Sequence, residues 1–207
     1  MPAEDLFLEI GTEEIPSGFL GRAFEDLCRL AKKTFGEARI AHGEVRALGT
    51  PRRLVLAVSD VAETQESLEE RVMGSAKSVA YDESGNPSKA ALGFAKGQGV
   101  AVESLEIVET EKGGYVSAIR KEEGRPTAEV LTERLPALIQ GLGFRKSMRW
   151  GDGDLRFARP IHWMVAILGG RVIPFELGGV ASGDRSRGHR FMAPGEFGVE
   201  GFEAYIE

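Results

Sequence analysis

Hydrophobic and polar positions in the first part of the chain predict a strand, a helix and a β pair. Residues 6–10 form a short, mostly apolar run closed by Gly11, which indicates a buried strand. Residues 16–35 repeat apolar side chains at three- and four-residue steps, as a helix with one buried face does. Residues 45–48 and 53–61 are rich in apolar and β-branched residues and flank a Gly-Thr-Pro turn, which predicts a β pair.

The middle of the chain predicts a smaller mixture of strands and one helix. Residues 66–73 are typical of a strand with its charged side chains outward. A helix is expected over 88–98, capped by Ser88 and with Ala91, Leu92 and Ala95 on its buried face. Residues 105–110 and 115–121 flank a Lys-Gly-Gly turn and predict a hairpin.

The last part of the chain predicts a helix over 126–142, kinked at Pro136, and a hairpin of residues 161–168 and 171–177. No internal repeat, coiled-coil heptad or low-complexity segment occurs. The expected fold class is therefore α+β, with mainly antiparallel sheets and a few packed amphipathic helices.

Charged residues are distributed unevenly along the chain, and this affects which binding partners are expected. The 207 residues carry a net charge of −6, which argues against a general nucleic-acid binder. The stretch from Arg145 to Arg190, however, holds nine Lys or Arg and four Asp or Glu. We therefore expect an α+β region over 1–143 and a basic, β-rich region over 144–207 that packs on it as one module. A chain of this kind can bind RNA locally.

Cysteine content and apolar run length exclude several classes of protein. Cys28 is the only cysteine, so an internal disulfide and a zinc site built on thiolates are excluded. The longest apolar run, residues 161–168, is too short to span a membrane, and no secretory leader is recognisable. We expect a cytoplasmic protein with no membrane partner.

A search for catalytic chemistry finds no candidate. The chain has no P-loop and no Gly-x-Ser-x-Gly elbow, and its three histidines lack metal-ligand spacing. Glu13 and Glu14 are adjacent, so we interpret them as solvated charges at a helix start rather than as an acid and base pair. We predict no catalytic residue, no metal site and no cofactor bound by this chain.

Residues 146–163 interleave cations with aromatic rings, a mixture that suits RNA because cations neutralise phosphates and exposed rings stack on bases. Alternatively, Trp150 and Trp163 are core residues and the arginines form a solvated rim. The candidates for RNA contact in this stretch are Lys146, Arg149, Trp150, Arg159 and His162.

Residues 184–192 are denser still in cations. If the segment is extended, Arg185, Arg187 and His189 lie on one face and require an anion. That anion is RNA, an acidic partner subunit, or Glu203 and Glu207 of this chain. Further candidates for RNA contact are Arg187, His189 and Arg190, with Arg52 and Arg53 as a weaker pair.

Several segments together resemble the β subunit of the bacterial α2β2 glycyl-tRNA synthetase, over essentially the whole chain and in the family's order. Gly74-Ser75 departs from the Gly-Pro that relatives often carry and affects only a local turn. The matching segments are Glu9-Ile10-Gly11-Thr12-Glu13-Glu14-Ile15-Pro16, Thr50-Pro51-Arg52-Arg53-Leu54, Pro87-Ser88-Lys89-Ala90-Ala91, Lys146-Ser147-Met148-Arg149-Trp150, Arg159-Pro160-Ile161-His162 and Gly188-His189-Arg190-Phe191-Met192.

The resemblance implies an N-terminal fragment of a subunit several times longer. In that family the α subunit forms glycyl-adenylate, the complete enzyme uses ATP and Mg²⁺, and the β subunit binds tRNA. The region also resembles the tRNA-binding part of archaeal CCA-adding enzymes, which implies contact with the acceptor arm and upper body of glycine tRNA.

Three hypotheses follow from the residues and the resemblance together. The first is a tRNA-binding module that is part of a glycine-tRNA ligase but is not catalytic alone. The second is a subunit-assembly module that docks the α subunit, with tRNA held mainly by the missing C-terminal regions. The third, a self-contained enzyme, requires ATP binding by this chain.

Overall fold

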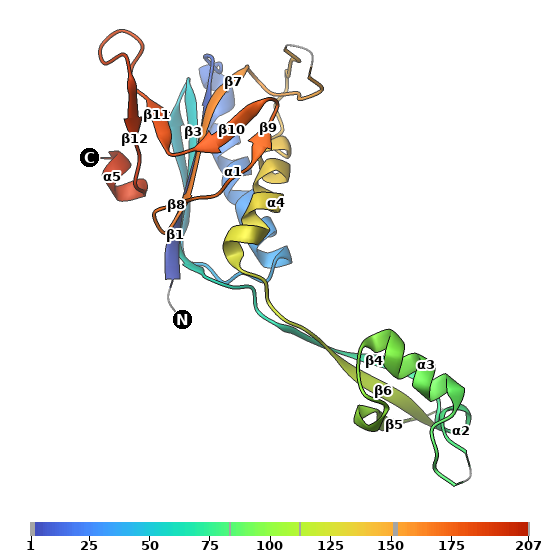
Figure 1. Cartoon of the computed structure of the whole chain (residues 1–207). Helices are drawn as coiled ribbons and strands as arrows, with labels where there is room; N and C mark the ends of the chain where they lie inside the picture. Colours follow the sequence, from blue (N-terminus) through green and yellow to red (C-terminus); the bar gives the residue numbers. More distant parts are fainter. Residues whose placement is uncertain (1–2, 83, 112, 151–152, 207) are drawn as a thin grey trace. The chain divides into compact units, whose positions relative to one another are not determined.

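The computed structural model describes residues 3–82, 84–111, 113–150 and 153–206, and the chain divides into two compact units (Figure 1). The main unit comprises the residues up to 66 and those from 125 onward, and the inserted unit is residues 67–124. The division differs from the boundary expected after residue 143. The reason is that the strand at 161–168 pairs with the first strand of the chain, so the basic region completes the first sheet instead of forming its own.

The main unit is built on one large sheet. Its central strand, β1, pairs antiparallel with β3 on one side and β7 on the other, so that Ile10 lies opposite both Leu54 and Met164. Among the described residues the sheet has seven strands, in the order β2-β3-β1-β7-β10-β9 with β8 beside β7. Their bounds are β1 Ala3–Thr12, β2 Val45–Thr50, β3 Arg53–Ala62, β7 Ile161–Leu168, β8 Arg171–Val172, β9 Glu176–Leu177 and β10 Val180–Gly183.

Both faces of this sheet are buried, which explains the nearly continuous apolar run in β1. Leu8 and neighbouring even-numbered residues of β1 pack under α1 (Ser17–Glu37) and α4 (Thr127–Gln140). Phe7 and Trp163 belong to a second cluster on the opposite face, against which α5 (Phe202–Ile206) packs. Glu9 lies on that second face and is fully buried, so one acidic side chain interrupts the core.

The predicted hairpin after residue 161 is only partly correct. Gly169 and Gly170 turn the chain with φ of 55° and 78°, as expected, and β8 follows. The expected strand over 171–177 is instead broken into β8 and β9. Pro174 lies between them and has no N–H to donate to a ladder, and the next N–H, that of Phe175, is bonded to the Ser182 hydroxyl.

A short hairpin of β11 (Arg185–Arg187) and β12 (Glu196–Gly198) carries the basic segment. Ser186 is buried while its two neighbours are exposed, so the alternation expected there holds within the strand. The strand ends at Arg187, however. His189 therefore lies in the following loop and not on the strand face shared by Arg185 and Arg187.

The inserted unit is a three-stranded antiparallel sheet in the order β4-β6-β5, together with short helices. Ser88 caps α3 as predicted, its Oγ accepting hydrogen bonds from the backbone N–H groups of Ala90 and Ala91. Leu92, expected on the buried face, is 49% exposed because α3 packs through Ala91 and Ala95. The elements are β4 Leu68–Ala76, α2 Lys77–Ala80, α3 Lys89–Gln98, η1 Val102–Ser104, β5 Glu106–Thr110 and β6 Gly113–Glu122.

Candidate functional site

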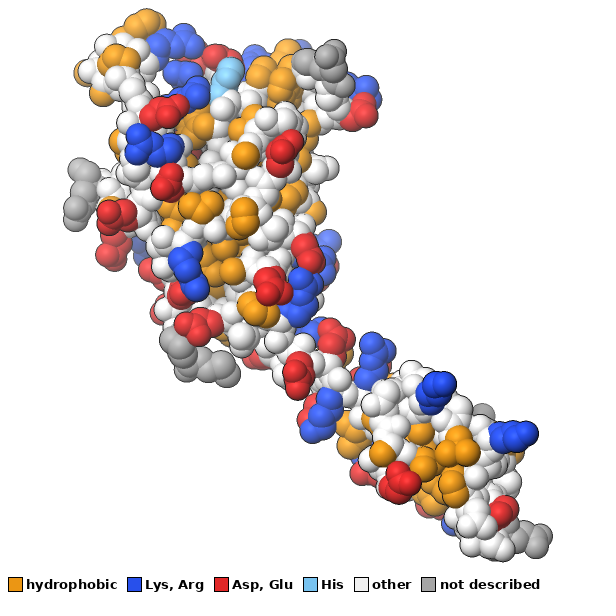
Figure 2. Space-filling model, viewed as in Figure 1, with side chains coloured by type: hydrophobic (Ala, Val, Ile, Leu, Met, Phe, Trp, Pro, Cys, Tyr) orange, Lys and Arg blue, Asp and Glu red, His pale blue; other side chains and the backbone are white. Residues whose placement is uncertain are grey.

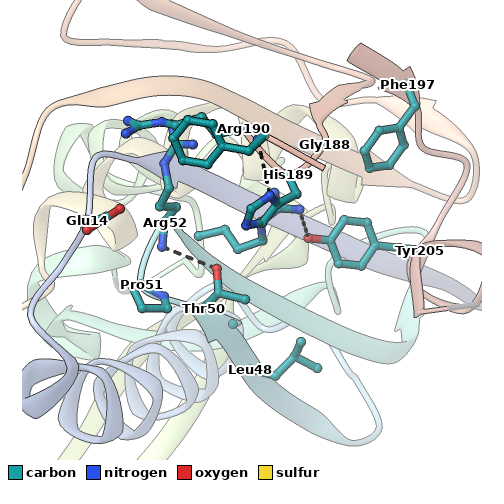
Figure 3. A pocket seen from close by; sticks show the side chains of 13 residues that line it. Glu14, Leu48, Thr50, Pro51, Arg52, Gly188, His189, Arg190, Phe197 and Tyr205 are labelled. Atoms are coloured by element: carbon teal, nitrogen blue, oxygen red, sulfur yellow. Dashed lines mark hydrogen bonds between the residues drawn. The ribbon is translucent and has the colours of Figure 1, made fainter. Parts of the chain in front are cut away.

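A groove of about 790 Å³ lies in the main unit, between the β2–β3 turn and the loop after β11. Residues 50–53 form one wall and residues 188–191 the other, so the structure brings together two segments more than a hundred residues apart. Figure 3 shows Glu14 and Arg52 at one end of this groove, Tyr205 and Phe197 at the other, and His189 between them.

Arg53 connects several elements beneath the groove. Its Nη1 donates to the Tyr205 hydroxyl at 3.0 Å, and its Nη2 donates to the backbone oxygen of Arg187 at 2.7 Å. Nη1 also lies 3.6 Å from Oε1 of the buried Glu9, and the Arg53 side chain is only 18% exposed. Arg53 was predicted as an RNA contact, but the observed bonds direct its guanidinium into the protein, where it fixes α5 and β11 to the sheet.

Glu9 is a buried carboxylate in a polar cluster beneath the groove. Its Oε1 accepts a hydrogen bond from Trp163 Nε1 at 3.1 Å. Burial raises the pKa of Glu9, while the Ser186 hydroxyl, the Arg53 guanidinium and the Trp163 N–H oppose that rise. Burial and the nearby Glu9 charge also raise the pKa of Tyr205. The pKa values of Glu9 and Tyr205 therefore depend on their shared surroundings, and the cluster lies beneath the groove.

Two side chains, one arginine and one histidine, lie against the carboxylate of Glu13, the residue before the groove-lining Glu14. Arg190 Nη2 lies 3.3 Å from Glu13 Oε2, and His162 Nε2 lies 3.4 Å from Glu13 Oε1. Glu13 is partly exposed, as expected of a solvated charge, but its interpretation as a helix-start charge is wrong. Helix α1 begins at Ser17, beyond Glu13, and the topology of the sheet places His162 and Arg190 beside this carboxylate.

Backbone hydrogen bonds fix the turn that presents Glu13. Thr12 N donates to Arg52 O at 2.8 Å, Ile15 N donates to Pro51 O at 2.7 Å, and Glu13 N donates to Pro160 O at 3.0 Å. Arg159 adds a bond from its Nε to the backbone oxygen of Glu14 at 3.0 Å. Arg159 thus stabilises this turn, and Arg52 contributes its backbone to it.

The loop after β11 has an ordered base and an exposed tip. His189 Nδ1 accepts hydrogen bonds from the N–H groups of Phe191 at 3.3 Å and Met192 at 3.2 Å. Gly188 is required at the base, because a Cβ there would lie 2.0 Å from the Ala193 oxygen. The Phe191 and Met192 side chains are 79% and 85% exposed. In Figure 2, hydrophobic and basic side chains meet at the upper left tip of the main unit, where Figure 1 places this loop.

Arg187 faces the opposite strand of its hairpin. Its Nε lies 3.3 Å from Glu196 Oε1, and its guanidinium carbon lies 5.4 Å from the centre of the Trp163 ring. We expected RNA, an acidic subunit, or Glu203 and Glu207 as the anion facing this segment. The observed partner is Glu196, directly opposite across the strands; Glu207 lies outside the described residues.

Lys146, Arg149 and Trp150 do not line the groove. Figure 1 places the segment before β7 on the other side of the sheet from the β11–β12 hairpin. Lys146 is exposed, Arg149 Nη1 lies 3.1 Å from Asp154 Oδ1, and Trp150 is half-buried against the main core. Trp163 is 7% exposed, so the alternative interpretation of it as a core residue is confirmed.

Glu9 and Phe191 were missed as parts of the site. A carboxylate inside an apolar run is a sequence signal, because burying a charge is costly unless it is paired. Phe191 lies next to Arg190, and its 79% exposure could not be read from the sequence.

In the part of the chain that the structure describes, no group of three or more His, Cys, Asp or Glu side chains is placed to hold a metal ion. The described helices also include none with the length and apolarity needed to cross a membrane.

Comparison with known proteins identifies a family. A sequence model of that family, described as glycyl-tRNA synthetase beta subunit, matches residues 6–207. The glycine–tRNA ligase beta subunit of Citrifermentans bemidjiense is 58% identical over 205 residues, which are 99% of this chain and 30% of that protein. The corresponding proteins of Geobacter sulfurreducens and Syntrophus aciditrophicus are 54% and 50% identical, with the same coverage. The chain thus spans about 30% of the length of these relatives.

Proposed function

The chain belongs to the glycyl-tRNA synthetase β-subunit family, and we propose that it is a tRNA-binding module. In this proposal it supports ATP-dependent attachment of glycine to glycine tRNA by an α2β2 complex in the cytoplasm. The observation that carries the proposal is the loop after β11. It presents Arg190, His189 and the exposed ring of Phe191 at the groove.

This arrangement fits single-stranded RNA better than a duplex. An exposed aromatic ring stacks on an unpaired base, and a neighbouring guanidinium contacts the phosphate. Arg190 and Phe191 form such a pair, since the guanidinium carbon lies 5.7 Å from the ring centre. A groove of about 790 Å³ has the size of a small-ligand site, so it suits one or two nucleotides of an acceptor end.

The resemblance to the family suggests a division of labour within the proposed enzyme. We assign ATP and Mg²⁺ to the α subunit and assign contact with the acceptor arm and upper body of tRNA to this chain.

A subunit-assembly role is the second candidate, and a specific observation favours it. The apolar side chains of Phe191 and Met192 are almost entirely exposed, as is typical of residues that a protein partner covers. Arg149 and Arg187 each already have a carboxylate partner, which lowers the positive charge offered to RNA.

The test is binding of glycine tRNA to this chain at two salt concentrations. We expect Arg190→Ala to weaken binding about five- to tenfold at low salt and to reduce the salt slope by about one, because one phosphate contact is lost. Arg29→Ala is the matched control. It removes the same charge from a 61% exposed side chain on α1, outside the groove, and it should leave binding unchanged.

A parent chain that is folded but fails to bind tRNA at either salt concentration would favour the assembly role. Capture of the α subunit by the parent chain, and its loss in Phe191→Asp, would then support that role. Binding of ATP by the chain alone, measured by calorimetry, would instead support a self-contained enzyme.

A further inference from the structure

The Glu13 carboxylate is shared by Arg190 and His162, and the whole arrangement is open to solvent. The Arg190–Glu13 ion pair measures 3.3 Å, and His162 Nε2 lies 3.4 Å from Glu13 Oε1. The side chains of Glu13, Arg190 and His162 are 39%, 44% and 38% exposed. A ligand can therefore reach both the guanidinium and the imidazole without unfolding any element of the main unit.

The backbone of Glu13 is fixed, and only its side chain is free to move. Its N–H donates to Pro160 O at 3.0 Å, and its carbonyl accepts a hydrogen bond from the Thr12 hydroxyl at 2.8 Å. Side-chain torsions turn the carboxylate away from Arg190 and His162 while the turn stays in place. Exposed ion pairs of this kind are weak, so little energy opposes the rotation.

A carboxylate and a phosphodiester are chemically alike at this position. Each presents two anionic oxygens to the planar fork of an arginine, and each accepts a hydrogen bond from an imidazole N–H. The phosphodiester is the natural ligand of the same two side chains when RNA is present.

We propose that Glu13 occupies the place of an RNA phosphate in the unbound chain, and that an incoming phosphodiester displaces it from Arg190 and His162. The inference rests on the proposed tRNA-binding function. Glu13 then competes with RNA for Arg190 and His162 and lowers the affinity of the site for RNA.

Replacement of Glu13 tests this role. We expect Glu13→Gln to tighten binding of glycine tRNA about three- to fivefold at low salt, a factor that corresponds to the free energy of one exposed ion pair. Glu37→Gln is the matched control because it removes the same charge from an exposed side chain. Glu37 is the last residue of α1, a helix about 30 Å long that begins beside the turn, so its charge should have no effect.

Two further variants separate competition from a structural role. Glu13→Asp keeps the charge, but its side chain is one methylene shorter and cannot reach both Arg190 and His162, so it should also tighten binding. In an Arg190→Ala background, Glu13→Gln should gain less than half as much.

Unchanged or weaker binding by both Glu13 variants, with an unchanged melting temperature and a parent chain that binds tRNA, would show that Glu13 only positions Arg190. Absence of tRNA binding by the parent chain would overturn the proposed function itself, and this inference with it. The two failures are therefore distinguishable.

Discussion

Arg53 places its Nη1 atom 3.6 Å from Oε1 of Glu9, a side chain with no exposed surface. On the paired strands β1 and β3, Arg53 lies opposite Gly11, and Glu9 lies opposite Val55. This ion pair joins the central strand of the sheet to the floor of the groove, because the same guanidinium also bonds to Tyr205 and to the backbone of Arg187.

Arg53→Ala should destabilise the main unit by about 3–5 kcal/mol at neutral pH, because it leaves Glu9 buried without a charge partner. Chemical denaturation followed by circular dichroism measures the change. Arg46→Ala is the matched control on the neighbouring strand β2. Its ion pair with Glu44 is exposed on both sides, so its loss should cost less than about 1 kcal/mol. Equal costs for the two variants would contradict a structural role for Arg53.

Glu9→Gln should change the pH dependence of stability. Burial raises the pKa of Glu9 in the folded chain above its unfolded value of about 4.3. The native state therefore binds the proton more tightly than the unfolded state. The contribution of Glu9 to the free energy of unfolding is fully present below the unfolded pKa and is lost as the pH rises through the folded pKa.

Glutamine does not titrate, so Glu9→Gln should gain stability relative to the parent chain between pH 4 and pH 7. Free energies of unfolding of both proteins, measured across that range, give the difference. A difference that stays flat with pH would show that the pKa of Glu9 is the same in the folded and unfolded states.

Gly11→Ala should destabilise the main unit by about 3 kcal/mol, because the added Cβ would lie 1.9 Å from Cε2 of the buried Trp163 ring. Gly21→Ala is the same substitution within α1, where the added Cβ would meet nothing within 4 Å apart from its chain neighbours and the backbone of its own helix. It should stabilise the same unit by about 0.5–1 kcal/mol through helix propensity. Thermal melting of the two variants should therefore move in opposite directions; a shift of the same sign would show that space at Gly11 is not the deciding factor.

Phe191→Ala should leave stability within about 0.5 kcal/mol of the parent chain, since the side chain is 79% exposed. If the ring stacks on a base, affinity for glycine tRNA should fall by about 1–3 kcal/mol without a change in salt slope. Met192→Ala is the control, because it removes an equally exposed apolar side chain without a ring. Equal losses in the two variants would indicate a general apolar contact and not stacking.

Elements with a clear local signal were predicted well. The helix expected over 16–35 and the β pair that follows were confirmed, because their periodicity reports directly which side chains face a core. Errors occurred where one residue changed the outcome. Pro174 divided the expected strand into β8 and β9, and Leu92 stayed exposed because smaller neighbours made the helix contact.

The basic segments show a second limit of prediction from the sequence. Cation density directed the prediction to residues 184–192, and the structure shows that residues 188–191 line a groove. The sequence could not separate Arg190, on the rim, from Arg53, which is directed inward. Both are arginines in short basic motifs, and the partner that distinguishes Arg53, Glu9, lies 44 residues away in the chain.

The α+β class, most of the elements and the motifs that carry the family relationship could be predicted from the sequence, since all of these depend on local order and spacing. Local order does not predict that the β2–β3 turn and the loop after β11 form one groove, or which of their arginines remain at its surface. These features depend on strand pairing between distant segments, because the pairing of β1 with both β3 and β7 brings Glu9 and Glu13 to their arginine partners.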